Sequence, residues 1–419
     1  MNFSNWIAKN GFLLFFAVAF FSTWMVSGTV TKTGGLFFAL LFGYAHLKNW
    51  DRRVQLMLLS LVIVIVIFLP LAIKGIANSD KIFSDVPVAI KIATQTLASG
   101  KNPYVENYYG TILDEATPYN IQFWERTGRP YLSLEHFAYM PTIFLASFPF
   151  EWAFPTVSYA WLALTILGIC FILVYFLAPT QVEWIWCVLF LNPFTWTSAL
   201  HMHSVDFLLL FFLLLFVMGW KKKNDWLMGI SLGLALGTKI YVWIAAPFLV
   251  YYFISTRQKK VLGGLALSAL FVHGPFLLWN TFAYLDDVVG LAVGSGTTSL
   301  TIWKEFYGLF PLLSRAGIIS VEATSAVLLL MAIVFAYLFY RYTSKQRDLL
   351  ATLAYSGLTT VCVFFVSKHF TNNYLTFPLF LGVIYLIGLT LSSSPKMERI
   401  FEGHAAKENS SYARWPPAR

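Results

Sequence analysis

The stretch that decides the fold reads Asp206-Phe-Leu-Leu-Leu-Phe-Phe-Leu-Leu-Leu-Phe-Val-Met-Gly-Trp220, followed by Lys221-Lys222-Lys223. A helix of this composition is apolar on every side, which places it in lipid or inside a large core. Similar runs recur along the whole chain, and about 20 apolar residues suffice to cross a bilayer. Lysines that follow a span stay on the cytoplasmic side. We therefore expect a membrane-crossing helix whose lysine end faces the cytoplasm.

The composition of the chain excludes an ordinary soluble domain. Of its 419 residues, 58% are hydrophobic and 12% are charged, whereas soluble domains carry roughly 25% charged residues. The net charge of +9 comes largely from basic clusters in short connections between apolar runs. Such clusters are a topology signal, so we expect membrane lipids and no nucleic acid as partners. The clusters are Lys48, Arg52 and Arg53; Lys221, Lys222 and Lys223; Arg257, Lys259 and Lys260; and Arg341, Lys345 and Arg347.

These patterns predict an all-α fold, a polytopic transmembrane bundle of about 11–13 membrane segments. We expect a single transmembrane domain over residues 1–391, an external loop over 74–137 after the third span, and a disordered cytoplasmic tail over 392–419. Two short apolar segments, 138–153 and 304–318, are interrupted by proline or charge and are expected to be interfacial or re-entrant. The expected spans lie near 11–28, 33–47, 54–73, 156–178, 184–199, 206–220, 226–238, 240–254, 260–280, 321–341, 349–367 and 374–391.

The cysteines and histidines do not form a recognisable metal site. Cys170, Cys187 and Cys362 lie scattered in apolar stretches without a CxxC spacing, which argues against a disulfide framework or a metal cluster. His201 and His203 would point apart on a helix, although Asp206 follows them closely. We predict neither a metal nor a cofactor.

The external loop holds the first candidate for chemistry. Asp85 lies about a dozen residues after the third span, in a segment apolar enough to lie along the membrane surface. A partly desolvated carboxylate there suits a general base that takes a proton from a sugar hydroxyl. The structural alternative is a helix N-cap, because Pro87 follows closely. Asp80, Asp114 and Glu115 are weaker candidates for the same role.

Lys239 is the most informative lysine. It lies between two short spans, directly after Gly237-Thr238. An ionisable residue at that depth is costly and usually faces a cavity or a partner, and a lipid-linked phosphate would be such a partner. Snorkelling to the membrane surface is the alternative. Lys368 and His369 lie at another outer edge and could complete a phosphate site.

Several further residues at the expected outer face are candidate substrate contacts. His136 and Tyr139 enter the apolar segment after the loop, although an interfacial aromatic belt would also explain Tyr139. His203 and Asp206 lie at the outer edge of a span, where Asp206 could instead be an N-cap. Tyr104 ends the segment Gly100-Lys101-Asn102-Pro103-Tyr104, which otherwise reads as a helix end and a proline turn.

Together these motifs resemble the GT-C superfamily of membrane glycosyltransferases, and within it the polyprenyl-phosphate-mannose-dependent family 87. The resemblance covers roughly residues 55–390. The motifs that carry it are Asp85, Gly100-Lys101-Asn102-Pro103-Tyr104, Tyr139-Met140-Pro141, Asn192-Pro193, Asp206, Gly233, Gly237, Lys239 and Pro247.

The resemblance implies an inverting transfer of a hexose, most simply mannose, from a polyprenyl-phosphate-linked donor to an acceptor hydroxyl. The acceptor would be a lipid, a glycan or a protein on the extracytoplasmic side, with a bacterial inner membrane the expected location. The resemblance assigns the catalytic base to Asp85 and a donor-phosphate contact to Lys239, helped by Lys368 or His369. No nucleotide site is needed, in agreement with a sequence that shows no glycine-rich phosphate loop.

Other functions compete with this interpretation. A transporter or flippase for lipid-linked sugars would also be polytopic and basic, but the sequence shows no internal repeat and few ionisable residues deep within spans. A ligase that joins glycans to lipid or protein usually has its large external loop late in the chain, whereas here it comes early. A purely structural subunit would leave Asp85 and Lys239 on one face unexplained.

Overall fold

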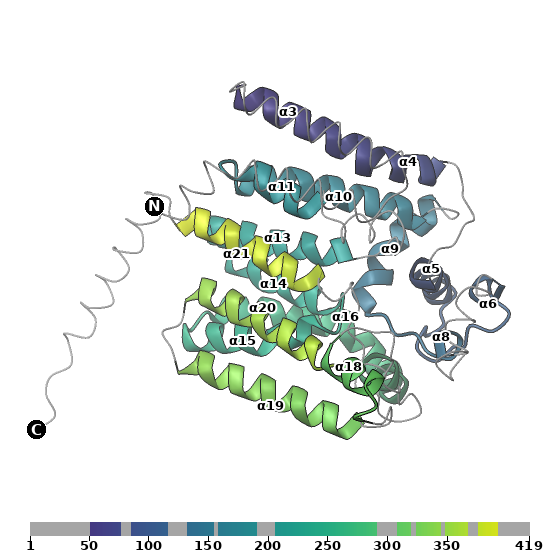
Figure 1. Cartoon of the computed structure of the whole chain (residues 1–419). Coiled ribbons are helices and arrows are strands. Elements are labelled where there is room, and N and C mark those ends of the chain that lie inside the picture. Colours follow the sequence, from purple (N-terminus) through teal and green to yellow (C-terminus); the bar gives the residue numbers. More distant parts are fainter. Residues whose placement is uncertain are drawn as a thin grey trace, which may run out of the picture.

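The structure is a computed structural model, and every regular element that it describes is a helix (Figure 1). The described residues are 51–76, 85–115, 132–154, 158–190, 206–290, 308–319, 324–344, 348–367 and 376–392. Within them the all-α prediction is confirmed. The spans predicted near 11–28 and 33–47 and the tail predicted over 392–419 lie outside the described residues, except for residue 392.

The helices of the N-terminal half include those that carry the predicted external segment. They are α3 (Arg52–Ile63), η1 (Val64–Phe68), α4 (Leu69–Ile76), α5 (Asp85–Ala98), α6 (Ile112–Glu115), α8 (Leu132–Glu135), α9 (Pro141–Ala153), α10 (Ser158–Leu177) and α11 (Val182–Phe190).

The helices of the C-terminal half match most of the predicted spans. They are α13 (Asp206–Lys222), α14 (Asp225–Leu236), α15 (Val242–Ser255), α16 (Lys259–Leu285), η3 (Asp286–Gly290), α18 (Leu309–Arg315), α19 (Thr324–Thr343), α20 (Leu349–Phe365) and α21 (Thr376–Ser392). The span expected near 260–280 is longer in the structure, because helical structure continues to Gly290. Asn280 interrupts α16, with φ −157° and ψ 93°. Its side-chain Oδ1 then accepts a hydrogen bond from the Ala283 N–H at 3.0 Å, so the helix restarts.

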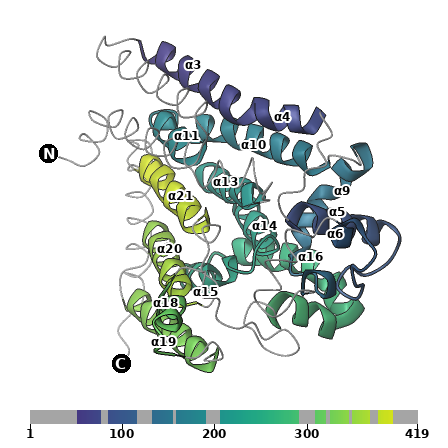
Figure 2. The ribbon, with the colours of Figure 1, turned by 45° about the vertical axis from the view of Figure 1, so that its right-hand side comes forward.

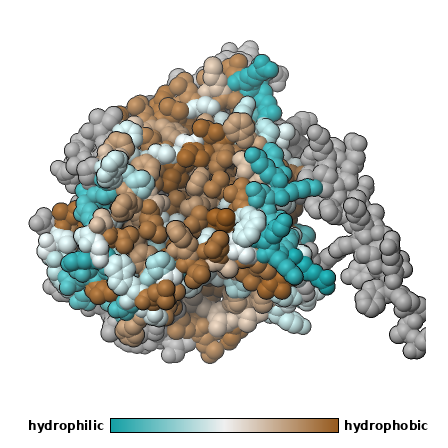
Figure 3. All heavy atoms as spheres, turned by 180° about the vertical axis from the view of Figure 1, so that it is seen from behind, coloured by the Kyte–Doolittle hydropathy of each residue, from teal (hydrophilic) through white to brown (hydrophobic). Residues whose placement is uncertain are grey.

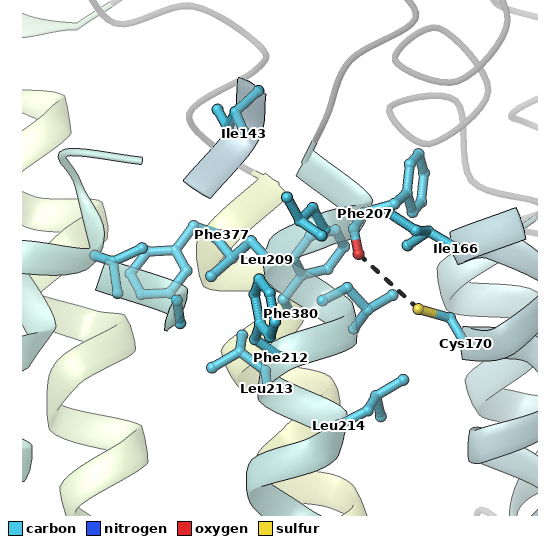
Figure 4. Packing of buried hydrophobic residues seen from close by; sticks show 14 of the residues in the cluster. Ile143, Ile166, Cys170, Phe207, Leu209, Phe212, Leu213, Leu214, Phe377 and Phe380 are labelled. Atoms are coloured by element: carbon cyan, nitrogen blue, oxygen red, sulfur yellow. Dashed lines mark hydrogen bonds between the residues drawn. The ribbon is translucent and has the colours of Figure 1, made fainter. Parts of the chain in front are cut away.

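α13 lies at the centre of the molecule because its side chains are apolar all round. It packs against α10, α14 and α21, and most of its residues are buried. Figure 4 shows Phe377 and Phe380 of α21 beside the α13 side chains, with Ile166 and Cys170 of α10 on the other flank. The three cysteines are free, and Cys170 and Cys187 are buried.

α14 and α16 make the tightest contact between helices. A Cβ atom at Gly229 would lie 2.1 Å from the carbonyl oxygen of Val261, and one at Gly233 would lie 1.9 Å from Ser268 Oγ. Larger residues at these positions would force the two helices apart. The close approach explains why glycine recurs along α14.

The two ends of the bundle differ in composition. Arg52 of α3 pairs with Glu183 of α11, and Lys221 Nζ donates to the Phe176 carbonyl at 2.8 Å, so these basic residues gather at one end. α5, α6 and α8 lie at the opposite end (Figures 1 and 2). Figure 3 shows the same division on the surface, where a broad apolar band borders a column of hydrophilic residues.

Large apolar side chains are exposed on the surface of the protein. Leu278 and Phe282 are 90% and 81% exposed. Among the described residues, two helices, Ala160–Leu177 and Lys259–Gly290, are long and apolar enough to cross a membrane, and six more apolar helices have 10–17 residues. These features are compatible with a membrane protein.

Candidate functional site

A buried ion pair joins Asp206 to Lys239. The Nζ atom of Lys239 lies 2.9 Å from Oδ1 of Asp206, and the two side chains are 19% and 1% exposed. The Tyr241 hydroxyl donates to the same Oδ1 at 3.0 Å, and the lysine ammonium lies 5.6 Å from the centre of the Tyr241 ring. A buried carboxylate needs such partners because its desolvation is costly. Asp206 and Tyr241 therefore hold the Lys239 ammonium in a fixed place.

The turn that carries Lys239 is positioned by the start of α9. The N–H of Thr142 donates to the Gly237 carbonyl at 2.9 Å, and Thr142 Oγ1 donates to the Leu234 carbonyl at 3.2 Å. A Cβ atom at Gly237 would lie 2.0 Å from Thr142 Oγ1, so only glycine allows this approach. Two motifs that are distant in sequence, Tyr139-Met140-Pro141 and Gly237 to Lys239, thus lie side by side.

Tyr104 is built into the packing around this region. It is 4% exposed, and its hydroxyl donates to the Tyr139 carbonyl at 2.8 Å. Its ring lies 5.5 Å from that of Phe137 and 4.8 Å from that of Tyr284. Asn102 Oδ1 accepts from the Tyr104 N–H at 3.1 Å, which closes the proline turn. In this position Tyr104 holds the loop after α5 against the segment before α9, and substrate contact by Tyr104 stays a prediction.

His136 forms a second ion pair, with Asp287. Its Nδ1 lies 2.7 Å from Asp287 Oδ1, and the Phe137 N–H donates to Asp287 Oδ2 at 3.0 Å. The two side chains are 16% and 6% exposed. Because Nδ1 donates to the carboxylate, the pKa of His136 is raised above its ordinary value.

The segment that carries Asp287 is fixed by a third polar contact. The Tyr284 hydroxyl and His273 Nδ1 are hydrogen-bonded to each other, and both residues are buried. Sequence reasoning missed Asp287, His273, Tyr284 and Tyr241. The Asp286-Asp287 pair beside an apolar run was the one available signal, because charge at such a position needs a partner.

The structure describes the remaining predicted site residues only in part. Asp85 is described only as the first residue of α5. His203, Lys368 and His369 lie outside the described residues. Asp114 Oδ2 accepts from the Gly110 N–H at 2.9 Å, as a loop-closing residue does. Within the described part of the chain, no three His, Cys, Asp or Glu side chains gather in a way that could hold a metal ion.

Comparison with known proteins agrees with the resemblance seen in the sequence. The sequence model described as Glycosyltransferase family 87 matches residues 137–367. The match includes Asp206, Lys239 and Asp287, whereas Asp85 and Tyr104 precede it. Searches of curated proteins and of solved structures gave no match. Because the family match spans more than half of the chain, the protein belongs to glycosyltransferase family 87.

Proposed function

We propose that this glycosyltransferase is an inverting membrane enzyme that takes its hexose from a polyprenyl-phosphate-linked donor. The expected sugar is mannose, and the acceptor is a hydroxyl group on the extracytoplasmic side. The family match supports a sugar donor and an acceptor. The lipid-linked donor, the sugar and the side of the membrane are the parts that we propose.

The observation that carries the proposal is the position of Lys239. α14 begins at Asp225, directly after the basic residues Lys221 to Lys223, and it ends at Leu236 just before Lys239. Because 12 residues of helix separate these points, roughly 18 Å at 1.5 Å per residue, Lys239 lies at the end away from the basic residues. If those residues mark the cytoplasmic side, the ammonium lies more than halfway across a hydrocarbon core of roughly 30 Å, in its extracytoplasmic half.

The Lys239 ammonium suits a phosphate group. An ammonium has three N–H donors, and Asp206 Oδ1 takes one of them. A leaving polyprenyl phosphate could accept from another, and a fixed cation would stabilise the negative charge that develops on it. Asp206 and Tyr241 then act by positioning the lysine.

The proposed reaction is a single displacement. The acceptor oxygen forms a bond to the anomeric carbon while the bond from that carbon to the phosphate oxygen breaks, and the electron pair leaves with the phosphate. The acceptor proton passes to Asp85, the base that the family resemblance implies. α5, which begins at Asp85, packs against α9, and the start of α9 lies on the Lys239 turn. This packing supports a role for Asp85 in the same site.

Donor turnover by Asp85→Asn tests the proposal. Purified protein is incubated with a panel of polyprenyl-phosphate sugars and an acceptor-containing membrane extract. We expect wild type to transfer from one donor and Asp85→Asn to lose about 10²- to 10⁴-fold in rate, the usual contribution of a general base. Asp114→Asn is the matched control, since Asp114 is bonded within its own loop, and it should keep its activity. Equal activity of wild type and Asp85→Asn would remove Asp85 from the mechanism, and no transfer from any donor would favour a transporter.

A further inference from the structure

The pair of His136 and Asp287 has the geometry of an oriented imidazole. Both carboxylate oxygens of Asp287 are used, Oδ1 by His136 Nδ1 at 2.7 Å and Oδ2 by the Phe137 N–H at 3.0 Å. A carboxylate bonded to Nδ1 fixes the tautomer and the orientation of the ring, and it leaves Nε2 as the second polar atom of the ring. Nε2 of His136 has no hydrogen-bond partner among the residues that the structure describes. The pair therefore presents one ring nitrogen for a ligand.

The helical segment that follows Asn280 holds the Asp287 carboxylate in place. The break at Asn280 lets the segment from residue 281 to Gly290 leave the helix axis. Tyr284 in this segment is bonded to His273 and packs against Tyr104, with 4.8 Å between the ring centres of the two tyrosines. Asp287 comes one turn later and is 6% exposed at its side chain. Several contacts thus fix Asp287, and through it the His136 ring.

The chain segment that carries His136 also carries aromatic residues. Tyr139 is half-buried, and its ring lies 5.4 Å from that of Phe137. Sites for small polar molecules combine aromatic surface with a few fixed polar groups. The neighbouring hydroxyls already have acceptors, since Tyr104 donates to the Tyr139 carbonyl and Tyr109 donates to Glu135 at 2.9 Å. The imidazole of His136, 16% exposed, is left as a polar group that a substrate can reach.

We propose that His136 is a specificity-determining residue whose Nε2 forms a hydrogen bond with one sugar hydroxyl of the donor or the acceptor, and that Asp287 positions its ring. The proposal rests on the proposed function, because it names a contact within the same transfer reaction. It assigns no proton transfer to His136. If His136 only held η3 against the segment before α9, its substitution would change transfer by the same factor for every sugar.

The substitution His136→Asn separates these two roles. The asparagine amide N–H can donate to Asp287 in place of Nδ1, while no atom of asparagine extends to the position of Nε2. Glu135→Gln is the matched control, since Glu135 lies in the same segment and is bonded to Tyr109. His136→Gln is the second variant, because its longer amide reaches toward the Nε2 position. It should keep part of the preference for the full substrate over the analogue that lacks the contacted hydroxyl.

The experiment measures kcat/KM for the full substrates and for a series of monodeoxy donors and acceptors. We expect His136→Asn to lower kcat/KM for the full substrate by about 10- to 100-fold, as the loss of a hydrogen bond in a desolvated site does. For the one analogue that lacks the contacted hydroxyl, the kcat/KM values of wild type and His136→Asn should be equal within about twofold. The two changes then remove the same interaction, as a direct contact requires. Melting temperatures of the variants in detergent show that the fold is kept.

The possible outcomes separate the two proposals. If wild type transfers sugar and His136→Asn loses the same factor with every analogue, His136 does not read a hydroxyl and the inference is wrong. Full activity of His136→Asn would also overturn it. If wild type transfers from no donor, the proposed function fails and the inference fails with it. Should His136→Asn lose its fold, the same comparison made with His136→Gln decides.

Discussion

Two buried aspartates at one end of the molecule have cations of different kinds. Asp206, with a side chain 1% exposed, pairs with Lys239, and Asp287, 6% exposed, pairs with His136. An ammonium group has three N–H donors around one nitrogen, whereas an imidazole is a planar ring with two nitrogen atoms. The first pair therefore fixes the place of a cation, and the second fixes the direction of a ring.

The two pairs also join different parts of the fold. Asp206 begins α13, a largely buried helix, and reaches the turn between α14 and α15. Asp287 lies in η3 and reaches the segment before α9. A hydroxyl, that of Tyr241, completes the first pair, whereas a backbone N–H, that of Phe137, completes the second. We expect the first pair to matter more for stability and the second more for the choice of substrate.

Lys239→Met should have the largest effect. It would leave Asp206 buried and without its cation, and removing one partner of a buried pair costs about 3–5 kcal/mol in unfolding free energy. Transfer should be lost as well, because the proposed phosphate contact is gone. Denaturant unfolding of the purified protein in detergent measures the first effect, and donor turnover measures the second.

The double variant Lys239→Met/Asp206→Asn is the control for this effect. Because an asparagine carries no charge, it should recover part of the lost stability but none of the lost transfer. Lys221→Met, which removes a surface lysine bonded to a carbonyl, should change neither. Full stability of the single variant Lys239→Met would mean that the pair contributes little to the fold.

Tyr241→Phe should have a smaller effect at the same pair. It removes the hydroxyl that donates to Asp206 Oδ1 at 3.0 Å and keeps the ring, which packs against Phe364 and Phe377. A hydrogen bond to a charged group contributes about 1.5–3 kcal/mol, so we expect a loss in that range by the same unfolding measurement. An unchanged unfolding free energy would show that another donor replaces the hydroxyl.

Apolar runs made the helices predictable. In lipid or in a core, a run such as Asp206 to Trp220 has few other ways to form the hydrogen bonds of its backbone N–H and C=O groups. Asp206 and Lys239 were both singled out from sequence, one as a substrate contact or cap and the other as a phosphate contact. Their pairing was not predicted, because it depends on how α13 packs against the α14–α15 turn. The roles of Asp85, Tyr104 and Tyr139 stay predictions.

The second pair shows where sequence reasoning stops. His136 was a candidate, but Asp287 was not, because it lies beyond the expected span near 260–280. The side chain of Asn280 caps the helix that restarts there, and Asp287 in this restarted segment contacts His136. Hydrophobic periodicity does not report such a restart, since it depends on one side-chain hydrogen bond.

The smallest expected effect is the pH dependence of the stability that the second pair contributes, which follows from the titration of His136. The pKa of His136 is raised above its ordinary value, about 6.5, by its hydrogen bond to Asp287. The charged pair is therefore lost, with the stability that it contributes, as the pH rises from about 6.5 through the raised pKa. We expect the melting temperatures of wild type and His136→Asn to converge between about pH 6 and pH 9. A gap that stayed constant over this range would show that the charge of His136 contributes nothing to the stability of the pair.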